Sequence, residues 1–212
     1  MIYLNGKTER DYNADYIHWE CSAPEVRSEM LQIPQRDGII NMTLMLSKEI
    51  HYGPRQIKIV LELRAIRAEW PMYYSQLLRD LHGREVTVAR SEDPNYFYIG
   101  TASVGPIDDH GSTAGVTIAV QAQPFKRTAA LIKEEAVQVT GSGTVTIENT
   151  YMRGYPVITA SAAGMTVELN GETFPLKQGE SEPYGLYFSE GENELTITGS
   201  GTIEISWRGG IL

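Results

Sequence analysis

Cysteine is nearly absent from this chain, because Cys21 is the only one among 212 residues. A single cysteine forms no intrachain disulfide and supplies no thiolate cluster for a metal, a pattern typical of proteins that fold in a reducing compartment. Long hydrophobic runs are also missing: residues 57–63 are interrupted by charges and fall far short of the roughly 20 residues needed to cross a bilayer. The first residues lack the basic stretch and apolar core of a signal peptide. We therefore expect folding in a cytoplasm and no membrane partner.

Basic residues are scarce and do not cluster. The formal net charge is −9. Residues 1–127 hold 14 Lys and Arg against 16 Asp and Glu, whereas residues 128–212 hold 4 against 11, so most of the acidity lies in the last part of the chain. A nucleic-acid-binding surface normally needs a stripe of Lys and Arg that displaces phosphate counterions. We therefore expect no specific recognition of nucleic acid.

Motifs with a known catalytic or cofactor-binding mechanism are missing as well. The four histidines do not stand at metal-ligand spacing, and the sequence has no nucleophile elbow or phosphate-binding glycine loop. Acidic pairs at residues 92–93 and 108–109 would be needed as acid and base in a glycosidase. Neighbouring residues of a strand point to opposite faces, however, and both pairs stand beside turn residues. The sequence therefore predicts no enzyme, no cofactor and no metal site.

Alternation of apolar and polar residues predicts a sheet in the first half of the chain. In residues 56–69 the apolar side chains recur at every second position, which indicates a long half-buried strand. Further strands rich in Val, Ile, Thr, Tyr and Phe are predicted at residues 85–89, 96–104 and 115–122. One helix is predicted over residues 71–81, because a proline stands in its first turn, leucines share one face and a glycine follows its end.

The second half of the chain contains many short strand-like segments separated by turn residues. Asn170-Gly171 between two such segments is typical of a two-residue hairpin turn. Glycine-serine stretches at residues 141–143 and 199–201 are also expected to be turns that separate strands. The even spacing of these segments predicts an antiparallel β-sandwich.

Several short motifs of the first half resemble, in their order and spacing, the distal tail proteins of siphophages that infect Gram-positive bacteria. They are Ile33-Pro34-Gln35-Arg36-Asp37-Gly38, Tyr52-Gly53-Pro54-Arg55, Leu77-Leu78 with Leu81-His82-Gly83-Arg84, the aromatic cluster from Asp93 to Gly100, and Pro124-Phe125-Lys126. Together they span about the first 127 residues. The chain departs from the family at Gln35, where a glycine is common. Residues 191–197 and 203–208 are similar to the galectin-like domain that follows in many members.

The resemblance implies a mainly β protein of two domains. Residues 1–127 would form a tail-tube-like β-sandwich or barrel domain with one short α-helix, and residues 128–212 a galectin-like antiparallel β-sandwich. It also implies a non-enzymatic virion protein, made in the cytoplasm of a bacterial host from a phage or prophage gene. Six copies would close into a ring at the tail tip or baseplate, join the tail tube protein to a tail-associated lysin or fibre, and let DNA pass through the lumen.

Residues 33–55 suit an arm that reaches a neighbouring subunit of such a ring. A cyclic ring uses head-to-tail interfaces in which each subunit gives one patch and receives another. An apolar hairpin that is buried on a neighbour supplies such a patch, although an ordinary core hairpin is the alternative. The residues predicted to lie in the subunit interface are Ile39, Ile40, Met42, Leu44, Met45, Leu46, Tyr52 and Arg55.

A different class of function remains open at this stage. The second domain alone is a candidate carbohydrate-binding module. Trp70, Trp207 and the twelve tyrosines of the chain could include a platform for a sugar ring, although aromatic residues of a β-rich protein more often belong to a core or an interface. The His-x-Asn-x-Arg sugar-binding triad of galectins is missing from the sequence, however, and sandwich shape alone is a weak reason to assign lectin activity. A glycan hydrolase is a third and weaker alternative.

Overall fold

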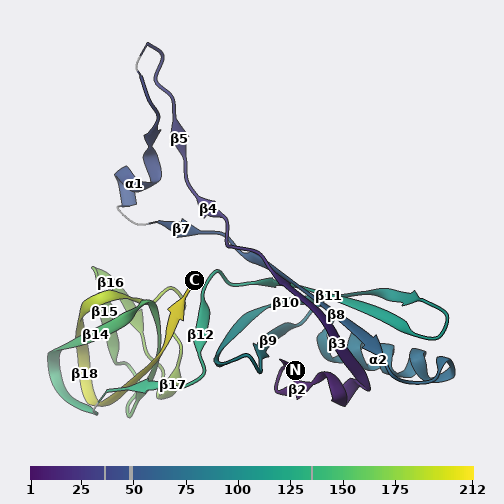
Figure 1. Cartoon of the computed structure of the whole chain (residues 1–212). Coiled ribbons are helices and arrows are strands. Elements are labelled where there is room, and N and C mark those ends of the chain that lie inside the picture. Colours follow the sequence, from purple (N-terminus) through teal and green to yellow (C-terminus); the bar gives the residue numbers. More distant parts are fainter. Residues whose placement is uncertain (36, 48–49, 135) are drawn as a thin grey trace. The chain divides into compact units, whose positions relative to one another are not determined.

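The computed structural model describes residues 1–35, 37–47, 50–134 and 136–212, with the backbone alone at residues 44 and 47 (Figure 1). The chain forms two compact units, Met1–Pro124 and Phe125–Leu212. The division falls inside the motif at residues 124–126 that was expected to close the first domain. Both units are mainly β, as the sequence predicted, and each is described by itself.

An antiparallel sheet forms the first unit, with the strand order β3-β8-β11-β10-β9-β1-β2. Residues alternate between buried and exposed along β8 and β11, so that one face of these strands lies on the core. The strands are β1 (Ile2–Leu4), β2 (Lys7–Thr8), β3 (Ala14–Cys21), β8 (Arg55–Leu63), β9 (Glu85–Arg90), β10 (Asp93–Asp109) and β11 (Ala114–Ala122).

Helix α2 (Trp70–Leu81) covers the core of this sheet and confirms the predicted helix. Its buried residues Trp70, Leu77 and Leu81 join the strand residues in one hydrophobic cluster, and the Trp70 indole donates a hydrogen bond of 2.9 Å to the carbonyl oxygen of Ala65. Two short 3-10 helices, η1 (Glu9–Tyr12) and η2 (Arg67–Glu69), precede β3 and α2.

The strand predicted over residues 56–69 is too long. It ends at Leu63, because that residue lies opposite Ala14 and Ala114, the first residues of the neighbouring strands β3 and β11. Without partners on either side the backbone leaves the sheet, and residues 67–69 form η2 instead.

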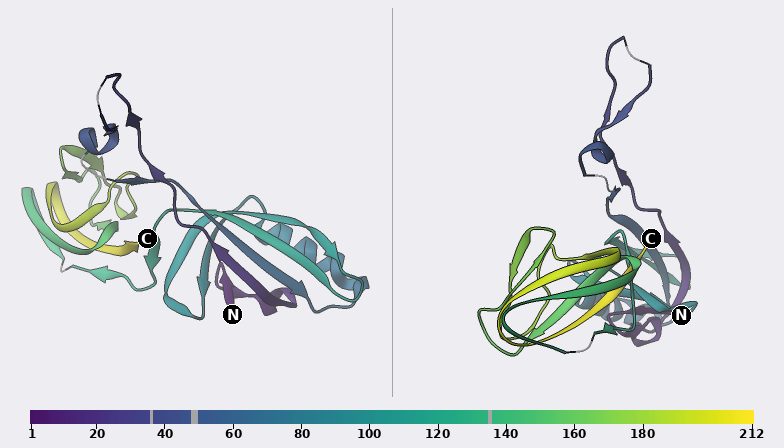
Figure 2. Two further views of the ribbon diagram at one scale, coloured as in Figure 1. Left: turned by 45° about the horizontal axis from the view of Figure 1, so that its top comes forward. Right: turned by 90° about the vertical axis from the view of Figure 1, so that its left-hand side faces the viewer.

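Residues 22–54, here called the arm, leave the sheet between β3 and β8. The arm contains β4 (Val26–Arg27), β5 (Met30–Leu31), β6 (Ile40–Asn41), α1 (Met42–Ser47) and β7 (His51–Tyr52). In all three views of Figures 1 and 2 it stands clear of the sheet of the first unit. The sequence predicted a hairpin here. The structure adds the short helix α1, in which four of the six residues are Met or Leu, residue types with good helix propensity.

The second unit is a sandwich in which two long strands contribute to both layers. Within each half, partner numbers on β18 fall as residue numbers on β14 rise, from Val137↔Ile203 to Asn149↔Gly191 and again from Gly154↔Gly209 to Ala160↔Ile203. The two strands therefore run antiparallel in both halves. β15 and β16 extend the first layer, and β17, β13 and β12 extend the second. The strands are β12 (Lys126–Thr128), β13 (Ile132–Lys133), β14 (Val137–Ala160), β15 (Thr166–Leu169), β16 (Glu172–Pro175), β17 (Gly179–Ser181) and β18 (Phe188–Ile211).

Two buried asparagines stabilise the place where β14 changes its register with β18. Between Asn149 and Arg153 the register with β18 shifts. The Asn149 amide donates to the carbonyl oxygens of Tyr151 at 2.8 Å and Ser189 at 3.1 Å, and the Asn193 amide donates to that of Ser189 at 2.9 Å. These bonds occupy carbonyls that the irregular ladder would otherwise leave unpaired in the interior.

Turn predictions in the second unit have mixed outcomes. The Asn170-Gly171 turn between β15 and β16 is confirmed: both residues have positive φ, 53° and 83°, as a type I′ turn requires. The expected turns at residues 141–143 and 199–201 are wrong, because both stretches lie inside the continuous strands β14 and β18. At Gly199 and Gly201 a Cβ would come within 3.0 Å of a Met165 or Ser161 atom, so glycine is needed there for close packing.

Candidate assembly interface

The arm is held together by its own backbone. β4 pairs with β7, with Val26 opposite Tyr52, and β5 pairs with β6, with Leu31 opposite Ile40. Between these ladders the amide of Met42 donates to the carbonyl oxygen of Glu29 at 2.8 Å, and the amide of Glu29 donates to Oγ1 of Thr43 at 2.9 Å. A two-stranded ribbon of this kind is only marginally stable by itself in water.

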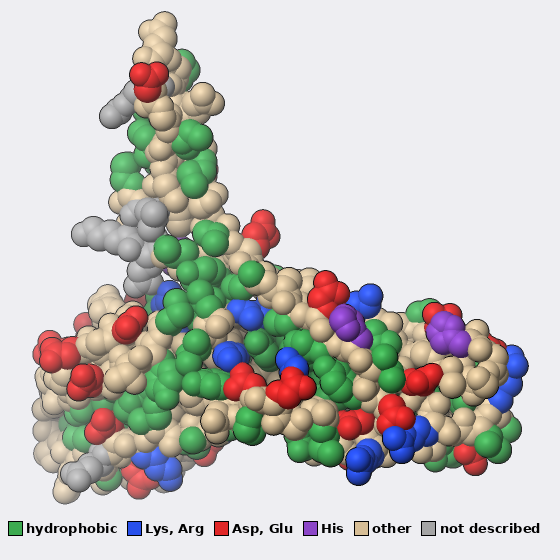
Figure 3. Space-filling view, viewed as in Figure 1, with side chains coloured by type: hydrophobic (Ala, Val, Ile, Leu, Met, Phe, Trp, Pro, Cys, Tyr) green, Lys and Arg blue, Asp and Glu red, His purple; other side chains and the backbone are tan. Residues whose placement is uncertain are grey.

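Apolar side chains of the arm are exposed. Figure 3 shows hydrophobic side chains along it on the face in view. Among the described residues, seven of the fourteen exposed large hydrophobic side chains belong to the arm, although the arm is only 33 of 212 residues. They are Val26, Met30, Leu31, Ile39, Met45, Leu46 and Ile50. Exposed apolar side chains concentrated on one segment of a folded protein are typical of a place where another molecule binds.

Three of the eight predicted interface residues lie on this exposed surface. Ile39, Met45 and Leu46 are 65%, 61% and 74% exposed, respectively. Ile40, Met42 and Tyr52 are half-buried against other residues of the arm. Leu44 lies in α1, and its side chain falls outside the described part of the chain, as does the whole of Arg36 from the first motif. Val26, Met30, Leu31 and Ile50 are also exposed but were not predicted. Val26 and Ile50 stand singly among polar residues, and Met30-Leu31 precedes residues 33–55, the stretch that suggested an arm.

The structure separates Arg55 from the other predicted interface residues. It is the first residue of β8 and is only 6% exposed. Its guanidinium lies 5.3 Å from the centre of the Tyr98 ring, and Nη1 is 3.5 Å from the Tyr98 hydroxyl and 3.7 Å from Sγ of Cys21. Burial raises the pKa of Tyr98. Arg55 therefore packs inside its own chain at the base of the arm, where its cation interacts with an aromatic face.

The backbone conformation of Gln35 is one that favours glycine. Its φ is 64°, in the left-handed region. A residue with a Cβ costs about 1–2 kcal/mol there, whereas glycine pays no such penalty. Gln35 therefore holds this conformation at some cost in free energy.

Other kinds of site find little support in the described residues. Over residues 1–35, 37–47, 50–134 and 136–212 no cluster of three or more His, Cys, Asp or Glu side chains could hold a metal ion. In the same part of the chain, no helix has both the length and the apolar character of a membrane span. Asp108 and His110 lie 3.5 Å apart, but both side chains are largely exposed.

Comparison with solved structures finds a protein of the same fold. The chain has the fold of the SPP1 Dit protein. The two superimpose with a TM-score of 0.58 over 100% of this chain and 98% of SPP1 Dit, at 15% sequence identity. SPP1 Dit is described as a paradigm of the hub adsorption apparatus in phages that infect Gram-positive bacteria. No protein-family model matches this sequence, and no curated protein matches it.

The likeness to SPP1 Dit extends over both units, because the alignment covers the whole of this chain. At 15% identity it establishes a shared fold. The mainly β architecture with antiparallel sheets that the sequence predicted is therefore confirmed both by the structure and by its likeness to SPP1 Dit.

Proposed function

We propose that this protein is a non-enzymatic structural subunit of a phage tail tip. In this proposal six copies form a ring that joins the tail tube protein to a tail-associated lysin or fibre protein, and DNA passes through the lumen without base-specific contacts. The whole-length likeness to SPP1 Dit carries the proposal, since it pairs both units of this chain with a protein of a phage hub. The family resemblance of the sequence motifs points to the same role.

The arm supplies the physical reason for assembly. Exposed side chains such as Ile39 and Leu46 are in contact with water in a single copy, and burying each on a neighbour would contribute about 1.5–3 kcal/mol. In a head-to-tail contact the arm of one subunit lies on a different patch of its neighbour. Such contacts close into a ring when the rotation between subunits allows it.

The proposal is tested by measuring the mass and shape of the purified full-length chain. Light scattering over a range of concentrations, with negative-stain microscopy of the largest species, is expected to show a closed ring of six copies with a central hole. The monomer is expected to accumulate on dilution, because ring closure depends on mass action. A monomer at every accessible concentration, together with saturable binding of a glycan to the second unit, would instead support the carbohydrate-binding alternative.

A further inference from the structure

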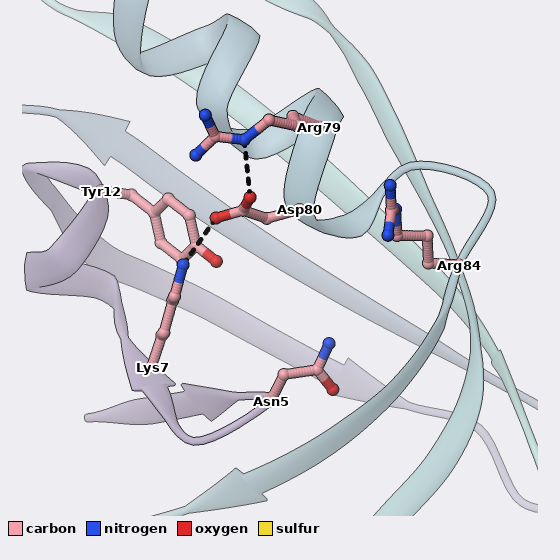
Figure 4. A pocket seen from close by; sticks show the side chains of 6 residues that line it. All are labelled: Asn5, Lys7, Tyr12, Arg79, Asp80 and Arg84. Atoms are coloured by element: carbon pink, nitrogen blue, oxygen red, sulfur yellow. Dashed lines mark hydrogen bonds and ion pairs between the residues drawn. The ribbon is translucent and has the colours of Figure 1, made fainter.

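A polar pocket of about 370 Å³ lies in the first unit, away from the arm (Figure 4). The turn between β1 and β2 contributes Asn5, β2 contributes Lys7, and η1 contributes Tyr12. The last turn of α2 contributes Arg79 and Asp80, and Arg84 follows just after α2. All six side chains line the same pocket.

Positive charge exceeds negative charge in this pocket. Three of the lining residues are cations, and Asp80 is the one carboxylate among them. Asp80 accepts hydrogen bonds from Nζ of Lys7 at 2.8 Å and from Nε of Arg79 at 3.1 Å, and Lys7 together with Arg79 lowers the pKa of its carboxyl group. Among the described residues Arg84 forms no ion pair. The pocket therefore carries a formal charge of about +2 in a chain whose net charge is −9.

The floor of the pocket holds a buried hydroxyl without a hydrogen-bond partner. Tyr12 is 0% exposed, and its hydroxyl forms no hydrogen bond of good geometry with a described residue, although the Asp80 carboxylate lies close enough to interact with it. Figure 4 shows this hydroxyl beside the Lys7 ammonium and the Asp80 carboxylate. Burial and the nearby Asp80 carboxylate raise the pKa of Tyr12 to about 12. The group is therefore a neutral phenol that can donate a hydrogen bond, and leaving it unpaired in the interior is unfavourable.

Asn5 also presents donors. Its side-chain oxygen already accepts a hydrogen bond of 2.8 Å from the backbone amide of Thr87, so its amide nitrogen is the part left for a ligand. The groups that remain for a ligand are thus the Tyr12 hydroxyl, the Asn5 amide, the Lys7 ammonium and the guanidinium of Arg84, all of them donors.

We infer that this pocket binds a small oxyanion, a carboxylate or a phosphate group, with Arg84 and Lys7 supplying charge and the Tyr12 hydroxyl a buried hydrogen bond. Apart from the Asp80 carboxylate, which is already paired with Lys7 and Arg79, the lining groups can all donate hydrogen bonds. Together with the excess of positive charge they match an anionic group that accepts hydrogen bonds. The pocket needs neither ring formation nor the arm, so this inference stands or falls separately from the proposed function.

The test is calorimetric titration of the full-length chain at constant ionic strength, with inorganic phosphate in one series and acetate in a second. Arg84→Gln is expected to weaken binding of the preferred anion about tenfold, because it removes a charged hydrogen-bond donor from the pocket. Arg67→Gln is the matched control. It removes another exposed arginine of the same unit, one that pairs with Asp109 outside the pocket, and is expected to leave the affinity unchanged.

Tyr12→Phe separates ligand binding from folding. The substitution keeps the shape of the ring and removes only the unpaired hydroxyl, so the unfolding midpoint without anion is expected to stay the same or rise. Anion affinity is expected to fall severalfold at the same time. Binding of phosphate or of acetate with these variant effects supports the inference and identifies the preferred class. Absence of saturable binding of either anion, or an equal loss in Arg84→Gln and Arg67→Gln, overturns it.

Discussion

A full-length chain carrying Met45→Glu and Leu46→Glu is expected to stay monomeric at concentrations at which the unaltered chain assembles. Both side chains are more than half exposed in the single chain, so their replacement costs little in folding. In an interface, each loses about 1.5–3 kcal/mol of apolar burial, and the new carboxylates must also be desolvated. We therefore expect the association constant to fall by at least about 100-fold. Sedimentation velocity over a concentration series measures it.

Tyr184→Glu serves as the matched control for the arm variant. Tyr184 is fully exposed but lies in the second unit, outside the arm. It is expected to assemble like the unaltered chain. Equal loss of assembly in both proteins would mean that added charge, rather than the arm, is responsible. Unaltered assembly of the arm variant would show that the exposed side chains of α1 take no part in the interface.

Gly100→Ala is expected to destabilise the first unit by about 3 kcal/mol, the upper range for overpacking a tight core position. A Cβ on Gly100 would lie 2.4 Å from the carbonyl oxygen of Gln121 and 2.5 Å from Cα of Ala122, both backbone atoms of the adjacent strand β11. Backbone in the middle of a sheet cannot move aside as a flexible side chain can. Urea denaturation of the full-length chain measures the loss as a lower transition midpoint.

Gly115→Ala is the control for this substitution. Gly115 lies in β11 of the same sheet, but the nearest atoms to its added Cβ would be His110 Nε2 at 3.4 Å and Asp108 Cβ at 3.7 Å, which are ordinary contacts. The variant is expected to be neutral or slightly stabilising, because alanine reduces the entropy of the unfolded chain. Similar destabilisation by both substitutions would show that loss of glycine itself, rather than the close approach at Gly100, is the cause.

The sequence predicted the elements whose pattern is local. Alternation along β8 and the leucines of α2 both report burial on one face, and Asn170-Gly171 reports a turn by its own backbone preference. The glycine-serine stretches led to a wrong prediction of turns, because glycine occurs both in turns and at places in a strand where the chain packs closely. At Gly199 and Gly201 it permits close packing inside a strand rather than a turn between strands, and the packing partner is distant in the sequence.

In the candidate sites, too, local patterns could be predicted from the sequence, whereas contacts between distant residues could not. An apolar stretch interrupted by charges predicted an arm, and Ile39, Met45 and Leu46 are indeed exposed on it. The burial of Arg55 could not be predicted, because it depends on Tyr98 from a strand 43 residues away. The oxyanion pocket was missed altogether, since Lys7 and Asp80 are 73 residues apart and neither belongs to a recognisable motif.

Contact between the arm and a neighbouring copy is tested most directly with a photo-reactive amino acid at position 46. Chains of normal and of heavy nitrogen isotope are mixed before assembly, irradiated, and digested for mass spectrometry. If the apolar surface of the arm is covered by an identical neighbour, cross-linked peptides containing one light and one heavy partner will be abundant. Cross-links found only between peptides of the same isotope would contradict this, because they would show that the arm folds onto its own chain.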